Sequence, residues 1–290
     1  MKIFISGSNG FTGKYLKKVL IEKGYDVFCG SLRCNDPNEY YFNLLDIDSM
    51  NSAFKTIGKI DFFIHLAATS FTLASDYEIE LNNKIGVKNL MRVLCKFYPN
   101  YNIFSSSASV YGNAKGALSE KSSLNPTTTY AKSKLFLEQE VLISGLKSIV
   151  VRPFNYTGIF QNDNFLIPKL IKNFKEKQDL IRLGNLDIKR EFNDVDDVVR
   201  IYSDFLNRAD LFTEKGSVFN IGSGKAYRIG DIVDLLCEIS GHKINVIRDE
   251  KLIRSNESQE LRCNIEKLAS IGIEPCSGNI NSLLKKMLNN

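Results

Sequence analysis

The fold is decided at the amino end of the chain, where residues 2–23 read KIFISGSNGFTGKYLKKVLIEK. Lys2–Ser6 is a short apolar run, and a glycine-rich turn follows it at once. Beyond the glycines, apolar side chains recur at positions 15, 16, 19 and 20, which is the spacing of one helix face. The segment therefore predicts a strand, a tight turn and a helix.

The same alternation of strand and helix continues to about residue 150. Buried strands are expected at 25–28, 60–66, 102–105 and 148–151, and helices at 47–57, 81–97 and 130–143. Each strand is apolar on both faces, which is typical of a parallel sheet covered by helices on both sides. We therefore expect an α/β protein built on a doubly wound parallel sheet of the Rossmann type.

The regular alternation of strand and helix becomes less clear after Arg152 and Pro153. Further helices are expected at 165–174, 196–206 and 229–240, with short strands at 218–221 and 244–247. We expect a Rossmann domain over residues 1–154, to which segments at about 190–225 return, and a smaller, mixed α/β lobe over residues 155–290. Ligands of such sheets bind in the crevice at the carboxyl edge of the strands, so the site is expected there.

Composition narrows the class of protein. The chain has 290 residues, of which 43% are hydrophobic and 24% charged, so its apolar side chains suffice for a sizeable core. The net charge of +5 is mild and the basic residues are scattered among acids, which argues against a nucleic-acid partner. No apolar run approaches the roughly 18–20 residues of a membrane span, and Met1–Gly10 lacks the apolar core of a secretory signal. We expect a cytoplasmic protein with no membrane partner.

Cysteine and histidine limit the chemistry. The six cysteines form no CxxC pair, and only His65 and His242 are available to complete a metal site, so we expect free thiols and no metal. The sequence also lacks an HExxH zinc motif and a GxSxG nucleophile elbow. Proton transfer is therefore expected from another kind of side chain.

The glycine turn is expected to hold a dinucleotide. Gly7, Gly10 and Gly13 stand between the first strand and helix, where glycine lets the backbone turn sharply and approach a pyrophosphate. The amides of Phe11 and Thr12 at the start of the helix, with the helix dipole, would attract that anion. The alternative is a tight turn that only packs helix on strand. We favour dinucleotide binding, which makes residues 1–154 an NAD(P)-binding domain.

The end of the second strand indicates which dinucleotide is bound. An NAD-binding unit usually places an acid there for the ribose 2′-hydroxyl. Ser31 and Arg33 stand there instead and would hold a 2′-phosphate, so NADP(H) is favoured over NAD(H). The alternative is that Arg33 is a solvated loop charge. Further residues follow strands where adenine and ribose would lie, namely Asp46, Ile47, Leu66, Ala67 and Ala68.

Two polar motifs supply candidates for proton transfer. Tyr130 and Lys134 are four residues apart on a predicted helix, so the phenol and the ammonium share one face, where the positive charge favours the phenolate. Upstream, the serines at 105–107 follow a strand end, where a hydroxyl can hydrogen-bond a substrate oxygen. Taken singly, the first motif is typical of a surface helix and the second of a loop or helix cap. Their order along the chain with the glycine turn favours one shared site.

Five motifs carry a resemblance to a known family. They read GSNGFTG at 7–13, FSSSASVYG at 104–112, TTYAKSK at 128–134, RPFNYTG at 152–158 and KREFNDVDDV at 189–198. In content, order and spacing the chain resembles the extended short-chain dehydrogenase/reductase family, in its NAD-dependent epimerase/dehydratase group that acts on nucleotide sugars. Within that group the carboxyl half is most similar to GDP-4-keto-6-deoxy-D-mannose reductases.

The resemblance implies roles for individual residues. Tyr130 would be the general acid/base, Lys134 would lower its pKa and bind the nicotinamide ribose, and Ser107 would orient the C4 oxygen of the sugar. Ser105 would contact the cofactor. Positions that match substrate contacts are Asn155, Arg190, Arg254 and Glu257, with the arginines directed to phosphate oxygens. The plain alternatives are an ion pair of Arg190 with a nearby acid and exposure of Arg254 to solvent.

Residues that the family carries and this chain lacks narrow the reaction. Nucleotide-sugar dehydratases of the family have an Asp-Glu pair where this chain has Ala108 and Ser109, so dehydration is not expected. Epimerase-reductases use a Cys and a His where this chain has Ala108 and, approximately, Phe160. We therefore expect NADPH-dependent reduction of the C4 keto group of a nucleoside-diphosphate 4-keto-6-deoxyhexose, similar to GDP-4-keto-6-deoxymannose, for glycan biosynthesis.

Two other functions and one assembly state remain open from the same pattern. A nucleotide-sugar 4-epimerase with tightly held NAD would use the same triad, and a non-catalytic dinucleotide-binding sensor would use the same fold. Helices 81–97 and 130–143 are more apolar than one sheet face requires, and relatives pair these helices in a four-helix bundle. A homodimer is therefore expected.

Overall fold

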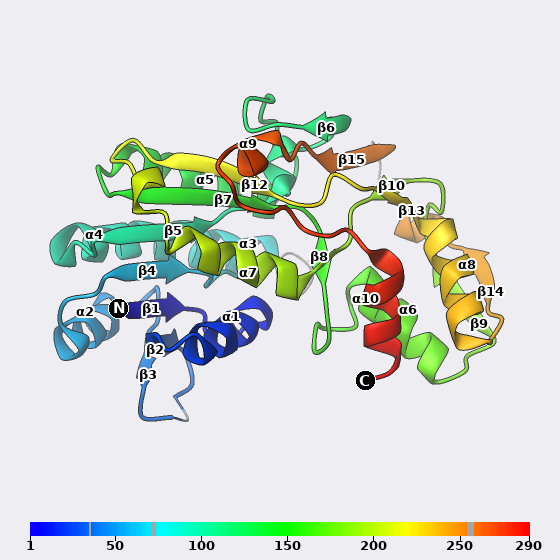
Figure 1. Cartoon of the computed structure of the whole chain (residues 1–290), viewed down its shortest axis with the longest axis horizontal. Helices are drawn as coiled ribbons and strands as arrows, with labels where there is room; N and C mark the ends of the chain where they lie inside the picture. The colour runs from blue at the N-terminus through cyan, green and yellow to red at the C-terminus, as the bar shows by residue number, and fades with distance from the viewer. Residues whose placement is uncertain (35, 71–73, 254–257) are drawn as a thin grey trace. The chain divides into compact units, whose positions relative to one another are not determined.

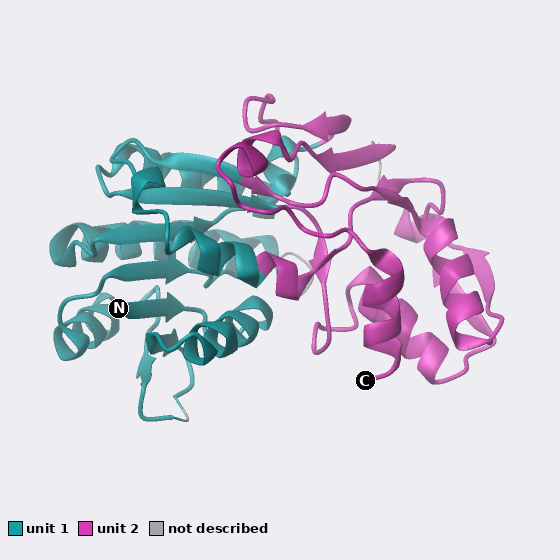
Figure 2. Cartoon of the chain, in the orientation of Figure 1, with its two compact units in different colours: residues 1–112, 126–153, 199–219 teal, residues 113–125, 154–198, 220–290 magenta. Residues whose placement is uncertain are grey.

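The computed structural model describes residues 1–34, 36–70, 74–253 and 258–290. These residues form two compact units (Figure 2). Unit 1 comprises Met1–Gly112, Pro126–Pro153 and Val199–Phe219, and unit 2 comprises Asn113–Asn125, Phe154–Val198 and Asn220–Asn290. The chain therefore passes between the units several times instead of completing one before the other.

Unit 1 is built on a seven-stranded sheet of the order β12-β7-β5-β4-β1-β2-β3 (Figure 1). Its strands are β1 (Lys2–Ser6), β2 (Asp26–Ser31), β3 (Glu39–Tyr41), β4 (Phe62–His65), β5 (Tyr101–Ser105), β7 (Ser148–Pro153) and β12 (Ser217–Ile221), the last of which continues into unit 2. β1 pairs in parallel with β2 and β4, and β5 pairs in parallel with β4 and β7. The doubly wound α/β fold predicted from the alternating pattern is confirmed.

Helices and helical turns connect these strands. They are α1 (Phe11–Glu22), α2 (Ile47–Ile57), α3 (Asp76–Glu80), the π-helical turn η1 (Leu81–Ile85), α4 (Gly86–Phe97), the 3-10 turn η2 (Ala108–Tyr111), α5 (Thr129–Ile143), most of α7 (Val195–Phe205) and the 3-10 turn η3 (Ala209–Leu211). The single helix predicted at 81–97 is therefore a π turn followed by an α-helix.

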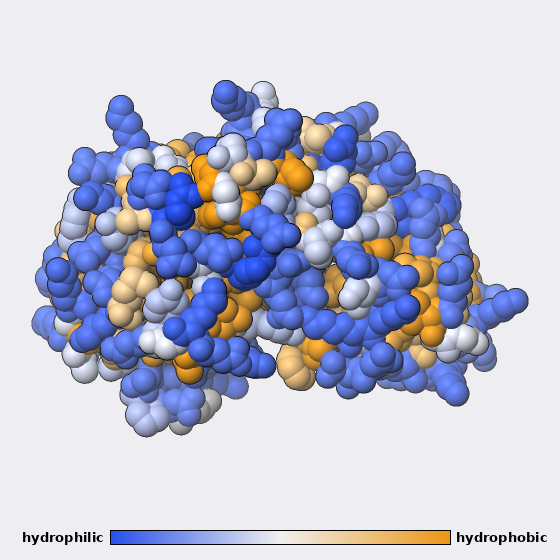
Figure 3. Space-filling view, in the orientation of Figure 1, coloured by the Kyte–Doolittle hydropathy of each residue, from blue (hydrophilic) through white to orange (hydrophobic). Residues whose placement is uncertain are grey.

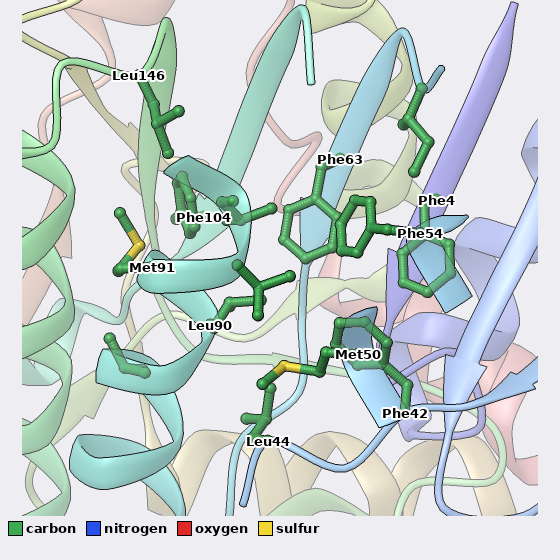
Figure 4. Close-up of a cluster of buried hydrophobic side chains, with 14 of the residues drawn as sticks. Phe4, Phe42, Leu44, Met50, Phe54, Phe63, Leu90, Met91, Phe104 and Leu146 are labelled. Carbon is green, nitrogen blue, oxygen red and sulfur yellow. The ribbon is translucent and has the colours of Figure 1, made fainter. Parts of the chain in front are cut away.

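An apolar core fills the face of the sheet that α2, α4 and α5 cover (Figure 4). Phe4, Phe63 and Phe104 project into it from neighbouring strands, and they meet Phe54 of α2 and Leu90 of α4. The residues that alternate with these phenylalanines along each strand are equally buried. They face the opposite side of the sheet, on which α1 and α7 lie in Figure 1. This two-sided burial is the reason that the strands are apolar on both faces.

Unit 2 is a smaller, mixed α/β unit, as expected for the carboxyl part. Its strands are β6 (Gly116–Leu118), β8 (Tyr156–Thr157), β9 (Leu180–Leu183), β10 (Lys189–Arg190), β11 (Asn193–Asp194), β13 (Tyr227–Arg228), β14 (Asn245–Arg248) and β15 (Glu260–Cys263), which form sheets of the order β13-β10-β15-β6, β11-β8 and β14-β9. Its helices are α6 (Leu166–Lys175), α8 (Ile229–Ser240), the 3-10 turn η4 (Glu250–Leu252), α9 (Glu266–Ser270) and α10 (Ile280–Leu288). Leu170, Leu236 and Leu284 join α6, α8 and α10 in a second apolar core.

None of the helices in the described ranges combines the length and the apolar character that a membrane crossing requires. All six cysteines are free thiols. Within the same ranges, no three His, Cys, Asp or Glu side chains gather in a way that could hold a metal ion.

Candidate active site

The glycine turn after β1 is packed closely against its neighbours. Gly7 has a φ of +77°, and its N–H donates to the Gly30 carbonyl oxygen of β2 at 2.8 Å. A Cβ on Gly7 would lie 2.6 Å from the Ala67 nitrogen, and one on Gly13 would overlap the Gly7 carbonyl oxygen. Gly10 caps α1 without a side chain, and the first turn of α1 holds no acid. The turn is therefore shaped for close approach of an anion to the helix start.

The other residues predicted for the cofactor follow the carboxyl ends of neighbouring strands. Phe11 and Thr12 open α1, Asp46 caps α2, Ile47 opens it, and Leu66, Ala67 and Ala68 come directly after β4. The Leu66 N–H donates to the Ser6 carbonyl oxygen at 3.0 Å, which brings the ends of β1 and β4 together. The Asp46 carboxylate accepts the N–H groups of Asp48 and Ser49 at 3.0 and 3.1 Å, so its first task is to cap the helix.

Ser31 and Arg33 form one small hydrogen-bonded loop with Asn9 of the glycine turn. The Asn9 side-chain amide donates to Ser31 Oγ and to the Arg33 carbonyl oxygen, each at 2.9 Å, and Ser31 Oγ donates to the same carbonyl. Arg33 is exposed, and no ion pair is recorded between its guanidinium and another described residue. The acids further along, Asp36 and Glu39, are paired with Lys17 at 3.2 and 3.0 Å. Arg33 is therefore exposed to solvent, while the nearby acids share the ammonium of Lys17.

Tyr130 and Lys134 come together on the first turns of α5. Thr128 caps this helix by accepting the Ala131 N–H at 3.1 Å. Lys134 Nζ lies 5.7 Å from the centroid of the Tyr130 ring and donates to the Ser105 carbonyl oxygen at the end of β5, at 2.8 Å. The structure thus joins the predicted tyrosine, lysine and strand-end serine in one place.

Burial changes the protonation of Lys134. The side chain is 4% exposed, and burial lowers its pKa to about 8, although the carboxylate of Glu138 acts in the opposite direction. Lys134 therefore carries its proton at neutral pH but releases it more easily than an exposed lysine. A cation held against the Tyr130 ring stabilises a phenolate, as a proton-transfer site requires.

Ser107 lies just beyond β5, in the segment that leads into η2. The preceding residue, Ser106, continues the sheet, because its N–H donates to the Val151 carbonyl oxygen of β7 at 2.8 Å. Ser107 Oγ accepts the Ser109 N–H at 3.1 Å and so caps η2. This hydrogen bond leaves the proton of the Ser107 hydroxyl available to a substrate oxygen.

His65 is a buried polar residue that the sequence reasoning considered only for metal binding. It ends β4 and is 1% exposed, and its Nδ1 lies 2.8 Å from Ser6 Oγ of β1. Burial, together with the positive charge of Lys134, lowers its pKa to about 3. His65 is therefore neutral at working pH and does not compete for the proton. A histidine inside the apolar run IDFFIHL was the available signal.

Asn83 of η1 was missed altogether. Its side-chain amide donates to the Thr69 carbonyl oxygen at 3.0 Å and to Ser133 Oγ at 3.1 Å, and its Oδ1 accepts the Thr69 N–H at 2.8 Å. Ser133 Oγ in turn donates to the Tyr130 carbonyl oxygen at 2.8 Å. Asn83 thereby fastens the loop after β4 to the turn of α5 that carries Tyr130. The signal was an Asn on the same helix face as Val87.

Apart from Ser107, which lies in unit 1, the described residues predicted for the substrate belong to unit 2. The Asn155 carbonyl oxygen accepts the backbone and side-chain N–H groups of Asn193 at 2.9 and 3.1 Å. Arg190 lies in β10 and donates to the Lys189 carbonyl oxygen at 2.8 Å, whereas Asp194 is paired with Lys286 at 2.8 Å. Arg254 and Glu257, also predicted from the resemblance, lie outside the described residues.

The neighbour of Arg190 is also firmly held. Glu191 is 1% exposed, and its carboxylate accepts the N–H groups of Ser223 at 2.9 Å, Gly224 at 3.1 Å and Cys263. It also accepts the Asn193 side chain at 3.0 Å. A buried carboxylate satisfied by several N–H donors fixes the backbone around it, so the position of Arg190 in β10 is well defined.

Comparisons with known proteins identify similar chains. Residues 3–222 match the model of the NAD dependent epimerase/dehydratase family. The chain is 32% identical to GDP-6-deoxy-D-talose 4-dehydrogenase of Aggregatibacter actinomycetemcomitans, over 100% of this chain and 98% of that protein. It is 29% identical to GDP-6-deoxy-D-mannose reductase of Pseudomonas aeruginosa, over 90% of this chain and 87% of that protein. The solved structure of RMD from Pseudomonas aeruginosa complexed with NADPH has a TM-score of 0.84 and 25% identity, over 99% and 98% of the two chains.

Proposed function

The chain belongs to the NAD dependent epimerase/dehydratase family, and from this premise we propose that it reduces the C4 keto group of a nucleoside-diphosphate 4-keto-6-deoxyhexose with NADPH. As a member of this family it is an enzyme that acts on nucleotide sugars and binds a nicotinamide dinucleotide. The product would be a deoxysugar nucleotide for polysaccharide biosynthesis. The observation that carries the proposal is the buried ammonium of Lys134 beside the Tyr130 ring.

In this proposal Tyr130 is the proton donor. Bound NADPH supplies the hydride that reaches C4 of the sugar. Tyr130 gives its phenolic proton to the C4 oxygen, Lys134 stabilises the phenolate that remains and binds the nicotinamide ribose, and Ser107 donates a hydrogen bond that orients the same oxygen. Lys134 keeps its place through the Ser105 carbonyl oxygen. Ala108 supplies no acid for dehydration.

The residues of unit 1 fit the dinucleotide. Gly7 and Gly13 admit no Cβ, and the start of α1 holds no acid that would repel a pyrophosphate. We propose that the amides of Phe11 and Thr12 face the pyrophosphate. Adenine and its ribose would lie against the strand ends marked by Asp46, Ile47, Leu66, Ala67 and Ala68.

NADP(H) is the favoured form of the cofactor. The exposed Arg33 would pair with a 2′-phosphate, and the nearby carboxylates of Asp36 and Glu39 are each paired with Lys17 instead of with Arg33. Arginine suits this role because its guanidinium forms forked bonds to phosphate oxygens. Ser31 would hold Arg33 in place and face the same phosphate.

We assign the nucleotide sugar mainly to residues 155–290 and the cofactor to residues 1–154. Asn155 and Arg190 would contact the diphosphate, and Arg254 with Glu257 would complete the pocket for the diphosphate and nucleoside. Both relatives described above are named for GDP-6-deoxy sugars. A guanosine diphosphate sugar is therefore the first substrate to test.

A second candidate is a nucleotide-sugar 4-epimerase that holds NAD⁺ and reduces it only transiently. One observation favours it: Ser31 Oγ donates its only proton to the Arg33 carbonyl oxygen and so has none to offer a 2′-phosphate. An epimerase retains its NAD through purification. Cofactor released by denaturing the purified protein, identified by mass, therefore separates the two functions.

The decisive assay follows NADPH oxidation with a panel of GDP-, dTDP-, UDP- and CDP-4-keto-6-deoxy sugars. We expect turnover with one nucleotide series and a product reduced at C4. The Tyr130→Phe variant should bind NADPH normally and lose about 10²–10⁴-fold in kcat, the usual contribution of a positioned general acid. Absence of NADPH oxidation with every sugar would rule out the reductase. If the Tyr130→Phe variant also kept all biological activity, the non-catalytic sensor would be favoured.

We also propose that the enzyme is a cytoplasmic homodimer that pairs α4 and α5 with those of a second copy in a four-helix bundle. Ile143 on α5 is 81% exposed, and it borders a groove formed with α4 by Lys88, Met91, Arg92, Cys95, Glu140 and Ser144. In this arrangement the second copy would cover the exposed Ile143 side chain. Light scattering should give twice the chain mass, and the Ile143→Asp variant should scatter as a monomer.

A further inference from the structure

A buried ion pair lies behind the candidate catalytic residues in unit 1. Arg152 of β7 and Glu138 of α5 are 4% and 1% exposed, and they meet in a forked contact with Nε–Oε1 at 2.9 Å and Nη2–Oε2 at 2.6 Å. Burial alone lowers the pKa of the Arg152 guanidinium, but the hydrogen bond and charge of Glu138 raise it above its ordinary value. The Arg152 guanidinium is therefore charged, and it faces the Glu138 carboxylate. A buried pair of this kind is weak evidence for stability, so it calls for another explanation.

The remaining atoms of the pair hold the segment that contains Ser107. Glu138 Oε1 accepts a hydrogen bond from Ser106 Oγ at 2.5 Å, and Arg152 Nη1 donates to Tyr111 Oη at 3.0 Å. The guanidinium carbon also lies 5.1 Å from the centroid of the Tyr111 ring. Ser106 and Tyr111 stand on the two sides of Ser107 in the chain, so the ion pair fastens both ends of this short segment.

Glu138 is at the same time part of the helix that carries the proton donor. Tyr130, Lys134 and Glu138 follow one another at intervals of four residues, so they lie along one side of α5. Lys134 holds the Ser105 carbonyl oxygen, and Glu138 holds Ser106. Lys134 and Glu138, on consecutive turns of α5, therefore hydrogen-bond two consecutive residues at the end of β5.

We propose that Glu138 and Arg152 are positioning residues that set the Ser107 hydroxyl against Tyr130 and Lys134 for proton transfer at one oxygen. This inference rests on the proposed function, because it assumes that Ser107 and Tyr130 act on the same substrate atom. Neither Glu138 nor Arg152 touches the substrate in this scheme. Their contribution is the distance and angle between the segment that carries Ser107 and the helix that carries Tyr130.

The pair also has an electrostatic effect on Lys134. The groups that face its ammonium are the Tyr130 ring and the Glu138 carboxylate on α5, the Ser105 carbonyl oxygen on β5 and the neutral His65 on β4. Glu138 is the only carboxylate among these four groups, and it opposes the lowering of the Lys134 pKa by burial. Without Glu138, Lys134 would lose its proton at a lower pH.

The test replaces both partners at once. In the double variant Glu138→Leu/Arg152→Met neither member of the ion pair is left behind without its partner, and exchange of such a pair for apolar residues often leaves stability unchanged or improved. We expect an unfolding temperature close to that of the wild type and KM values within about twofold, but a kcat lower by about 10–100-fold, since a misplacement of about 1 Å has effects of that order. The basic limb of the kcat–pH profile should move to lower pH, because Glu138 opposes the lowering of the Lys134 pKa by burial.

Single variants measure how much of the loss in kcat comes from each end of the segment that contains Ser107. Ser106→Ala and Tyr111→Phe each remove one contact with the pair, and each should lower kcat by less than the double variant does. The control is Arg200→Ala, which breaks the half-exposed pair of Arg200 with Asp204 on α7 at 3.1 Å and should leave both kcat and the pH profile unchanged. A well-folded double variant with the wild-type kcat and pH profile would overturn the proposal.

Amide hydrogen exchange tests, without turnover, whether Glu138 and Arg152 hold the segment around Ser107. We call this set of contacts the clamp. The N–H groups of Val110 and Gly112 donate to Ser107 and Ser109 carbonyl oxygens at 3.2 and 3.0 Å, so exchange over 106–112 reports on this segment. We expect amide exchange over 106–112 to be faster in the double variant than in the wild type, and exchange over α2 to be the same in both. If the wild type reduces no sugar, the proposed function fails, while exchange still decides whether the clamp exists. Unchanged exchange over 106–112 would overturn the inference whatever the activity.

Discussion

Replacement of Lys134 by methionine should make the protein more stable while it abolishes catalysis. Lys134 is fully charged at neutral pH in both the folded and unfolded states, but its folded pKa is lowered from 10.5 to about 8 by burial. Each pKa unit corresponds to about 1.4 kcal/mol, so burial of this charge opposes folding by about 3 kcal/mol at pH 7. The variant also loses the hydrogen bond to the Ser105 carbonyl oxygen, which reduces its gain in stability by about 1 kcal/mol. We expect Lys134→Met to be about 2 kcal/mol more stable than the wild type.

The pH dependence of this difference identifies its source. As pH rises above about 8, the folded lysine gives up its proton while the unfolded lysine keeps it until about 10.5. The wild type therefore gains stability relative to the variant over this range, and the gap between the two should close toward pH 10.5. Urea unfolding of both proteins at pH 7 and pH 10, followed by far-ultraviolet circular dichroism because the chain has no tryptophan, measures it.

A matched control is available on the same helix. Lys132 is exposed, so Lys132→Met removes a lysine from α5 without relieving any burial, and its unfolding midpoint should stay within experimental error of the wild type. The reasoning is refuted if Lys134→Met is less stable than the wild type at pH 7. It is equally refuted if the stability gap is the same at pH 7 and pH 10.

Two further predictions follow from single residues. His65 stays neutral down to a folded pKa of about 3, whereas an unfolded histidine takes up a proton near pH 6.5. As pH falls through this range, the wild type should therefore lose about 1.4 kcal/mol of stability per pH unit relative to His65→Gln. Equal acid sensitivity of the two proteins would contradict the assignment. If Arg33 holds a 2′-phosphate, Arg33→Ala should weaken NADPH binding by about 10–100-fold and leave NADH binding unchanged, as calorimetric titration with both cofactors would measure. Equal weakening for both cofactors would assign Arg33 to the loop instead.

The parts of the fold and site that were predictable from sequence are those that arise locally. Gly7 and Gly13 were assigned to a tight turn because a short strand and a helix flank them, and the structure has no space for a Cβ at either position. Tyr130 and Lys134 were placed on one helix face from their spacing alone, and they do lie together. In each case the relevant geometry is contained in a few consecutive residues.

The contacts that were missed join residues far apart in the chain. Asn83 reaches Ser133 at a separation of fifty residues, and the Asn83 side chain takes the place of a backbone partner for Thr69. Arg152 reaches Tyr111 across forty-one. A polar residue in such a contact looks in the sequence like an interruption of an apolar pattern. Nothing near it in the chain indicates its partner.

Helix α5 illustrates why such interruptions carry information. Its buried side contains Ser133, Lys134 and Glu138 among apolar residues, while Ile143 at its end is 81% exposed, so the separation of apolar and polar faces that packing alone would select is absent. Burial of a lysine and a carboxylate opposes folding unless each finds a partner. Lys134 donates to the Ser105 carbonyl oxygen, and Glu138 pairs with Arg152 and also accepts from Ser106, next to Ser107. Violations of the helix pattern that are repaired by contacts to one short segment are best explained by what that segment must do. The polar residues of α5 are therefore best explained by the proton transfer that we propose for Tyr130 and Ser107.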